Sequence, residues 1–309
     1  MLRFIASRIL QFPFILAVIY LITYLLAWVV PGTPFEGEKK IDPVVKHRLQ
    51  TQFHADKPVQ FLIYYPWKMI RHGDLGPSLL NQQFSVNEII GAALPVSVTL
   101  GIVAVGIAVF VGVGIGTLAA VKRGGVFDWL SLSVALVGIS LPSFVAAGLL
   151  VALFATKLHW FPYGGWGSPR DIVLPSIALS LVPMAYIARL TRVSMIDVLG
   201  SDYVRTARAK GLTKRAVVWK HCLRNAFLPV LSYLGPAAAY TLTGSFVVEK
   251  VFTIPGLGQH FVDSIRNRDQ TLILGTVMVY SFFLLTLNLV VDVLYAFVDP
   301  RIDVTAKGS

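Results

Sequence analysis

The sequence predicts an all-α protein that crosses a lipid bilayer several times, and three observations lead to this fold class. Of the 309 residues, 55% are hydrophobic and only 14% are charged, against a charged share of roughly 25% in soluble domains. The mean hydropathy is +0.70, which a water-soluble enzyme would not tolerate. The hydrophobic residues gather in six long runs, and roughly 20 such residues let a helix cross a bilayer core. The chain is therefore predicted to be a polytopic membrane protein.

The six predicted spans run approximately over residues 12–30, 96–121, 130–155, 172–190, 228–248 and 272–298. The third contains Pro142 and the fourth Pro183, and prolines inside membrane bundles mark kinks more often than ends. The first run is too long for the core of a cleaved secretory signal, and Trp28-Val29-Val30-Pro31 offers no small-residue cleavage site. We expect it to remain as an anchor, and we treat residues 1–309 as a single transmembrane domain.

The basic residues predict the orientation of these spans. The formal net charge is +11, and nine of the 27 Lys and Arg residues lie between Arg189 and Arg224. Cytoplasmic connections carry an excess of Lys and Arg. We therefore expect the connection 193–227 and both chain termini to be cytoplasmic. Since topology accounts for the basic excess, no nucleic-acid partner is expected.

The first external connection, residues 31–95, is too long to be a simple link between two spans. Asp42-Pro43 is typical of a helix start, which predicts a short helix to about Phe53. Residues 58–72 predict a second helical piece that is rich in aromatic side chains, and Ser85-Val86-Asn87-Glu88 has the capping-box spacing that begins a third. The aromatic piece is expected to lie at the membrane interface or to bind an external partner, and these interpretations are compatible.

A second external segment, residues 249–270, contains Ile254-Pro255-Gly256-Leu257-Gly258, which predicts a tight turn beside a membrane helix. Together the two external segments supply candidate residues for docking of an external binding protein. These residues are Tyr64, Trp67, Asp74, Pro255 and Gly256.

The cytoplasmic connection predicts a helix–turn–helix that projects from the membrane. Ser201 is placed to cap a helix over residues 202–210, Gly211 to end it, and Thr213 to cap a second helix. The small residues Ala207, Ala209 and Gly211 would let another protein approach this surface closely. The alternatives are a basic loop that only satisfies topology and a loop that lies on anionic lipid.

The same segment carries a family resemblance. The run Tyr203-Val204-Arg205-Thr206-Ala207-Arg208-Ala209-Lys210-Gly211-Leu212, with His221-x-Leu-Arg-Asn-Ala-Phe-Leu-Pro229 after it, resembles the "EAA" loop of binding-protein-dependent ABC importers in its peptide-importer form. Ala207 and Gly211 match the general pattern, whereas Arg205 replaces Glu, Thr206 replaces the first Ala, and Pro229 comes late. These departures fit oligopeptide and dipeptide permeases better than sugar importers.

Other motifs extend the resemblance over nearly the whole chain. Five further motifs are similar to the B-type membrane subunit of oligopeptide permeases. They are Pro31-Gly32-Thr33-Pro34-Phe35-Glu36-Gly37-Glu38, Gly73-Asp74-Leu75-Gly76-Pro77-Ser78, Leu231-Ser232-Tyr233-Leu234-Gly235-Pro236, Ile254-Pro255-Gly256-Leu257-Gly258 and Val291-Asp292-Val293-Leu294-Tyr295-Ala296. The resemblance implies a type I ABC importer permease in the bacterial cytoplasmic (inner) membrane. Its substrate would be oligopeptides, or alternatively dipeptides.

The resemblance also implies a division of labour. Partners would be a second, related permease subunit, cytoplasmic ABC ATPase subunits and an extracytoplasmic peptide-binding protein. The ATPase-coupling residues would be Arg205, Thr206, Ala207, Arg208, Ala209, Lys210, Gly211, Leu212, Thr213, Lys214 and Arg215. The chain contains no Gly-Lys dipeptide and so no Walker A loop. ATP and Mg²⁺ are therefore expected in the partner subunits, with no cofactor and no enzymatic activity in this chain.

Few residues remain as candidates for chemistry inside the spans. One cysteine, Cys222, and six scattered histidines make no metal-binding pattern. Asp292 is the one carboxylate within a predicted span, with Asn288 one turn before it. The pair is a candidate for the translocation path or gate, or alternatively a structural contact near the cytoplasmic end.

Gly112-x-x-x-Gly116 predicts a close helix–helix contact inside the second span. The rival function is an ion-coupled secondary transporter, which would call for internal repeats and paired intramembrane charges. The sequence offers no clear repeat, and Asp292 is the only intramembrane acid. The sequence therefore favours a permease subunit.

Overall fold

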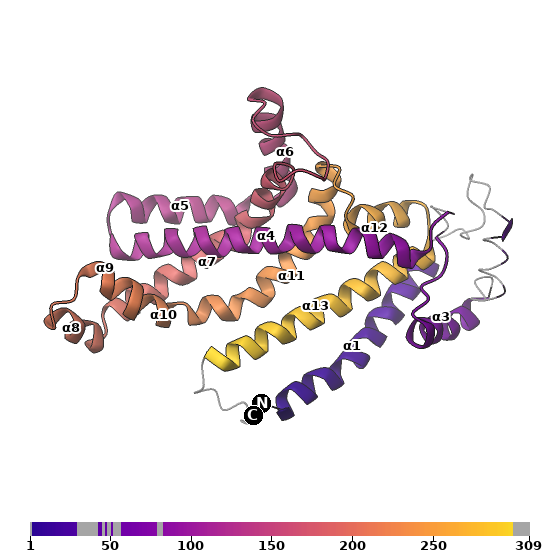
Figure 1. Cartoon of the computed structure of the whole chain (residues 1–309), viewed down its shortest axis with the longest axis horizontal. Coiled ribbons are helices and arrows are strands. Elements are labelled where there is room, and N and C mark those ends of the chain that lie inside the picture. Colours follow the sequence, from indigo (N-terminus) through magenta and orange to yellow (C-terminus); the bar gives the residue numbers. More distant parts are fainter. Residues whose placement is uncertain are drawn as a thin grey trace. The chain divides into compact units, whose positions relative to one another are not determined.

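The computed structural model describes residues 2–29, 43–44, 47, 51, 57–78 and 83–298, and in this part of the chain helices are joined by turns (Figure 1). The chain divides into two compact units. Unit 1 holds residues 98–252 and 287 onward, and unit 2 holds residues 2–97 and 253–286. The motif Pro31–Glu38 and most of the helix expected to end near Phe53 lie outside the described residues.

Unit 2 is built on helix α1 (Leu2–Val29), α3 (Pro58–His72), the start of α4 (Val86–Val121), α12 (Leu257–Arg266) and the first part of α13 (Gln270–Val298). Its aromatic core holds Tyr20, Tyr24, Phe61, Tyr65, Leu274 and Met278. The Tyr24 hydroxyl donates a hydrogen bond to the Pro58 carbonyl (2.7 Å), and Tyr20 donates to Leu62 (3.2 Å). The predicted aromatic helix is confirmed with the expected bounds, and it packs on α1 through these groups.

Residues 73–78 form a strap that polar contacts tie to α4 and α13. The Leu75 N–H donates to Oδ1 of Asn87 (2.9 Å), at the start of α4. The Ser78 hydroxyl donates to the buried carboxylate of Asp269 (2.6 Å), which also accepts the N–H of Leu272 (3.1 Å) and so caps α13. The strap therefore holds the beginnings of α4 and α13 together within unit 2.

The capping box at Ser85 and Glu88 is confirmed, but the helix that it begins is longer than expected. The Ser85 N–H donates to the Glu88 carboxylate (2.7 Å), and the Glu88 N–H donates back to the Ser85 hydroxyl (3.3 Å). Helix α4 then continues for 36 residues through Pro95. The expected short third helix and the second span are one helix, because Pro95 removes one N–H donor without ending the helical path.

Unit 1 is organised around α7 (Val173–Leu199), the most thoroughly buried of the candidate spans. It contacts α5 (Val126–Ser140), α6 (Ser143–Leu150) and α11 (Leu228–Val251). Helix α4 reaches α7 through two glycines. A Cβ on Gly112 would lie 2.8 Å from the Met184 carbonyl oxygen, and one on Gly116 would lie 2.7 Å from Cβ of Thr191. The predicted glycine-mediated contact is confirmed.

Four helices in the described residues are long and apolar enough to cross a membrane, namely α1, α4, α7 and α13. A fifth candidate is a pair of helical segments, α5 and residues 143–157, between which the helix axis bends by 105°. Pro142 therefore marks a sharp bend, whereas α7 passes through Pro183. Helix α11 covers the expected fifth span. The count of six spans and the cytoplasmic placement of the termini stay predictions.

Candidate functional site

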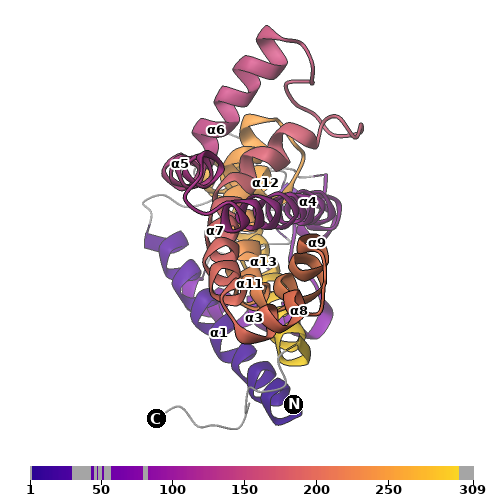
Figure 2. The same ribbon diagram turned by 90° about the vertical axis from the view of Figure 1, so that its left-hand side faces the viewer.

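The connection that is predicted to be cytoplasmic folds as a compact group of short helices that follows α7 in unit 1. The group comprises α8 (Asp202–Ala209), α9 (Lys214–Ala216), a π-helical segment (Val217–Cys222) and α10 (Leu223–Ala226). Figures 1 and 2 show these helices gathered at the end of α7. The predicted helix–turn–helix is present.

The turn at Gly211 follows from local backbone chemistry. Gly211 has φ +80°, in the left-handed region where a side chain is disfavoured. Its N–H donates to the Arg208 carbonyl (3.0 Å), and the Leu212 N–H donates to the Ala207 carbonyl (3.3 Å). These two bonds make a Schellman motif, which closes α8. Thr213 then caps α9 by accepting the Ala216 N–H (3.3 Å), as expected.

Ser201 departs from the expected capping role. It stands at the N-cap position of α8 with extended backbone, but its side chain accepts no capping hydrogen bond. Its hydroxyl instead donates to the carbonyl of Val198 (2.6 Å), at the end of α7. Ser201 therefore joins the two helices through its side chain, while its backbone carbonyl accepts the Val204 N–H (3.2 Å).

The inner face of the group packs against α4 and α7. The buried cluster, which we call the loop-base cluster, consists of Ala120, Met195, Val204, Ala207, Val217, Cys222 and Ala226. Burial raises the pKa of the Cys222 thiol above its ordinary value. The structure corrects the expectation at Ala207: the residue is only 7% exposed and belongs to the buried cluster, so it offers little surface to a partner.

The outer face of the group is basic and exposed. The other residues predicted for coupling are exposed: Arg205, Thr206, Arg208, Ala209, Lys210, Gly211, Leu212, Thr213, Lys214 and Arg215. Two apolar side chains stand beside them, Leu212 at 41% and Trp219 at 64% exposure. Sequence reasoning did not single out Trp219, although a tryptophan amid Lys and Arg residues is typical of binding surfaces. The arrangement suits an acidic protein surface with apolar recesses.

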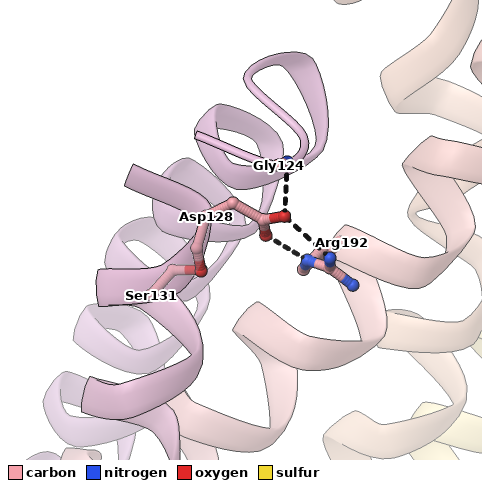
Figure 3. A network of polar contacts seen from close by, with 4 residues as sticks. All are labelled: Gly124, Asp128, Ser131 and Arg192. Carbon is pink, nitrogen blue, oxygen red and sulfur yellow. Dashed lines mark hydrogen bonds and ion pairs between the residues drawn. The ribbon is translucent and has the colours of Figure 1, made fainter. Parts of the chain in front are cut away.

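An ion pair that the sequence did not reveal lies between α5 and α7 (Figure 3). The Arg192 guanidinium donates to both carboxylate oxygens of Asp128, from Nε to Oδ1 (2.5 Å) and from Nη2 to Oδ2 (2.9 Å). The Gly124 N–H also donates to Oδ2 (2.9 Å). The Asp128 side chain is 8% exposed and that of Arg192 is 19% exposed. Nothing in the sequence analysis paired these two residues, which lie 64 positions apart.

Asn288 and Asp292, the candidates for the translocation path, lie one turn apart on the part of α13 that belongs to unit 1. Both side chains are half-buried. Asn288 lies against α11, because a Cβ on Gly235 would come within 2.8 Å of the Asn288 Oδ1 atom. This contact gives Asn288 a packing role, and its role in a path stays a prediction.

The five external candidates differ in exposure. Tyr64, Trp67 and Pro255 are exposed. The Arg71 guanidinium lies over the Trp67 ring, 5.1 Å from its centroid. Asp74 instead shapes the strap, since its Oδ1 accepts the Gly76 N–H (2.9 Å). Gly256 is buried directly before α12. The docking role of the exposed three stays a prediction, whereas Asp74 and Gly256 position the backbone.

Comparison with known protein families gives one match over most of the chain. Residues 112–304 match the family described as "Binding-protein-dependent transport system inner membrane component". The matched segment includes the whole connection 193–227, the Asp128–Arg192 pair and all of α13.

Two curated relatives match over nearly their full lengths. The dipeptide transport system permease protein DppB of Bacillus subtilis is 44% identical over 308 residues, which is 100% of both chains. The oligopeptide transport system permease protein OppB of Escherichia coli K12 is 42% identical over 304 residues, covering 98% of this chain and 99% of the relative. The two relatives carry different substrate names at similar identity.

Solved structures show the same fold at low identity. An inward-facing structure of the MetNI methionine ABC transporter aligns with a TM-score of 0.59 at 14% identity, over 69% of this chain and 97% of the other. An amino acid ABC transporter crystallised with histidines aligns with a TM-score of 0.52 at 19% identity, over 68% of this chain and 94% of the other. The chain therefore has the fold of ABC importer permeases.

Proposed function

Because the chain belongs to the family of binding-protein-dependent transport system inner membrane components, we propose that it forms half of the peptide pathway of an ATP-driven importer. It is a multi-pass protein of the inner membrane and a transport subunit, not an enzyme. The proposed substrates are oligopeptides or dipeptides, as the names of the two curated relatives suggest. The proposed partners are a related permease subunit, ABC ATPase subunits that bind ATP and Mg²⁺, and an external peptide-binding protein.

The exposed face of the cytoplasmic loop is the proposed contact with the ATPase subunits. The observation that carries this proposal is the loop's two-sided construction. Its inner side is fixed to α4 and α7 by the loop-base cluster. Its outer side exposes the five Lys and Arg residues of the predicted coupling set, together with Lys220, Arg224 and the apolar residues Leu212 and Trp219. A partner that pushes on the outer side would displace the ends of both helices, because packed interiors are nearly incompressible.

The mechanism needs no reacting group in this chain. Alternating access requires two packed arrangements of similar free energy, which ATP and the loaded binding protein bias in turn. Asn288 and Asp292 are proposed to line the path. On the external side, Tyr64, Trp67 and Pro255 are proposed to contact the binding protein, with Asp74 and Gly256 holding the backbone beneath them.

The substitution Gly211→Asp tests the coupling role. A side chain at φ +80° strains the Schellman turn and adds a negative charge to a basic surface. The expected result is normal insertion into the membrane, loss of ATPase subunits from the purified complex, and loss of uptake of labelled dipeptides and longer peptides. Deletion of residues 210–214 should act in the same way.

Gly165→Asp is the matched control, because Gly165 also has a positive φ (+110°) and open space around it but lies outside the loop. This variant should retain the ATPase subunits and uptake. Normal transport by the Gly211→Asp variant would reject the coupling role. Comparing dipeptide with longer-peptide uptake in the unaltered complex identifies the substrate class.

A further inference from the structure

We propose that the Asp128–Arg192 ion pair is the positioning contact that makes the cytoplasmic end of α5 move with α7 and the loop. This inference rests on the proposed coupling role of the loop. It adds a pair of residues outside the loop that decides whether movement of the loop reaches α5. From α5 the movement would pass to the 105° bend that joins it to the residues 143–157.

The pair lies where three helices meet, directly beside the loop-base cluster. Arg192 is three residues before Met195, a member of that cluster. At the same level α4 approaches α7, since a Cβ on Gly116 would lie 3.1 Å from the Arg192 backbone nitrogen. Asp128 brings α5 to the same point. A displacement of the loop therefore reaches Arg192 through less than one further turn of α7.

The geometry of the pair fixes the relative orientation of the two side chains as well as holding them together. A two-pronged contact between guanidinium and carboxylate fixes the angle between the groups, which one hydrogen bond would leave free. The Gly124 N–H holds the Asp128 carboxylate from the side of the α4–α5 turn. The side chains of Asp128 and Arg192 are largely shielded from water, so salt screens their attraction less than that of an exposed pair. The turn, α5 and α7 are thus joined at one point.

A separate contact explains why the pair is a coupling element more than a requirement for folding. A Cβ on Gly138 would lie 3.2 Å from the Leu181 carbonyl oxygen and 3.3 Å from the Ala185 methyl group, so α5 and α7 also touch there. Gly138 is ten residues beyond Asp128, about 15 Å along the helix. Loss of the ion pair would release the cytoplasmic end of α5 while this second contact keeps the helices packed.

The test measures peptide imported per ATP hydrolysed by the whole transporter, reconstituted in liposomes with its loaded binding protein. Asp128→Asn and Arg192→Gln should each lower this ratio about tenfold, within the usual range of coupling between sites. ATPase subunits should remain bound and hydrolysis should continue. The exchange Asp128→Arg with Arg192→Asp should restore a large part of the ratio. Arg192→Lys keeps the charge but loses the two-pronged hydrogen bonding, so its ratio should lie between those of Arg192→Gln and the unaltered protein.

Asp197→Asn is the matched control, because Asp197 is an exposed acid on the same helix as Arg192 and the chemical change is the same. It should leave the ratio unchanged. Unchanged ratios in Asp128→Asn and Arg192→Gln would overturn the inference. An exchange variant that accumulates in the membrane but imports about tenfold less peptide per ATP than the unaltered transporter would overturn it as well. This outcome covers the case in which the single variants fail to fold.

Failure of this inference differs from failure of the loop's proposed role. If Gly211→Asp abolishes uptake while the Asp128 and Arg192 variants keep their ratio, the loop's role stands and the ion pair has none in coupling. If Gly211→Asp leaves uptake intact, the loop's role falls and the inference falls with it.

Discussion

Replacing Gly116 by Ala should force α4 away from α7. The added methyl group would meet the Ala188 carbonyl oxygen at less than contact distance, with Cβ of Thr191 at 2.7 Å. The first of these neighbours is a backbone atom, so no change of rotamer can relieve the overlap. The helices must separate instead, and the packing between them is lost.

The magnitude follows from a comparison with a second glycine on the same helix. Gly114 has no atom within 4 Å of an added Cβ, so Gly114→Ala changes only the conformational preference of the backbone. That preference favours Ala by about 0.8–1.0 kcal/mol in a helix interior, and it applies equally to both variants. Their difference isolates the steric term, which is about 1–3 kcal/mol for overpacking in a tight core.

The assay is unfolding of the purified transporter in increasing concentrations of SDS, followed by protease resistance of this subunit. Gly116→Ala should unfold at a lower SDS concentration than the unaltered protein, and Gly114→Ala at the same or a higher concentration. Gly112→Ala should resemble Gly116→Ala, because its methyl group would lie 2.8 Å from the Met184 carbonyl oxygen. Equal stability of Gly116→Ala and Gly114→Ala would refute the steric argument.

Three further predictions concern single contacts. Cys222 should react slowly with a maleimide at neutral pH, because burial raises its thiol pKa and lowers the thiolate fraction, and Gly211→Asp should speed the labelling. Ser85→Ala should weaken the first turn of α4 by about 1 kcal/mol through loss of the capping box, seen as faster amide hydrogen exchange there. Gly235→Ala should lower resistance to SDS by colliding with Asn288, and the added change Asn288→Ala should restore it.

Local features of the fold were predictable because their causes are local in sequence. Helix α3 begins at a proline and ends at a left-handed glycine, Gly73, with φ +62°. The Schellman turn at Gly211 and the cap at Thr213 depend on residues at most five positions apart. Such signals act through backbone geometry and neighbouring side chains, so a single sequence contains them.

Contacts between distant residues could not be predicted in the same way. Asp128 and Arg192 are 64 positions apart, and Ser78 and Asp269 are 191 apart. Each of these four residues is of a type that is common at its position, either as a charged residue at the end of a span or as a helix cap. Which acid meets which donor is decided by how the helices pack, and hydropathy carries no information on that choice.

The two prolines show the same limit within single helices. Leu141 precedes Pro142 and has ψ 115°, in the extended region that proline imposes on its neighbour. The residue before Pro183 stays helical, because α7 is packed on several sides and the surrounding helices hold its path. The outcome at each proline depends on tertiary support and not on the proline itself, so one rule could not serve both.

The way in which α7 is held in unit 1 bears on how it could transmit a push. Gly112 and Gly116 of α4 and Gly138 of α5 all bring their backbones against carbonyl groups of α7. Contacts between backbones contain no rotatable side chain that could absorb a displacement, unlike contacts between long apolar side chains. Movement along or across α7 should therefore reach α4 and α5 with little loss. At the N-terminal end of α5, beyond the Gly138 contact with α7, the two-pronged hydrogen bonding of Arg192 to Asp128 supplies the same stiffness through polar groups.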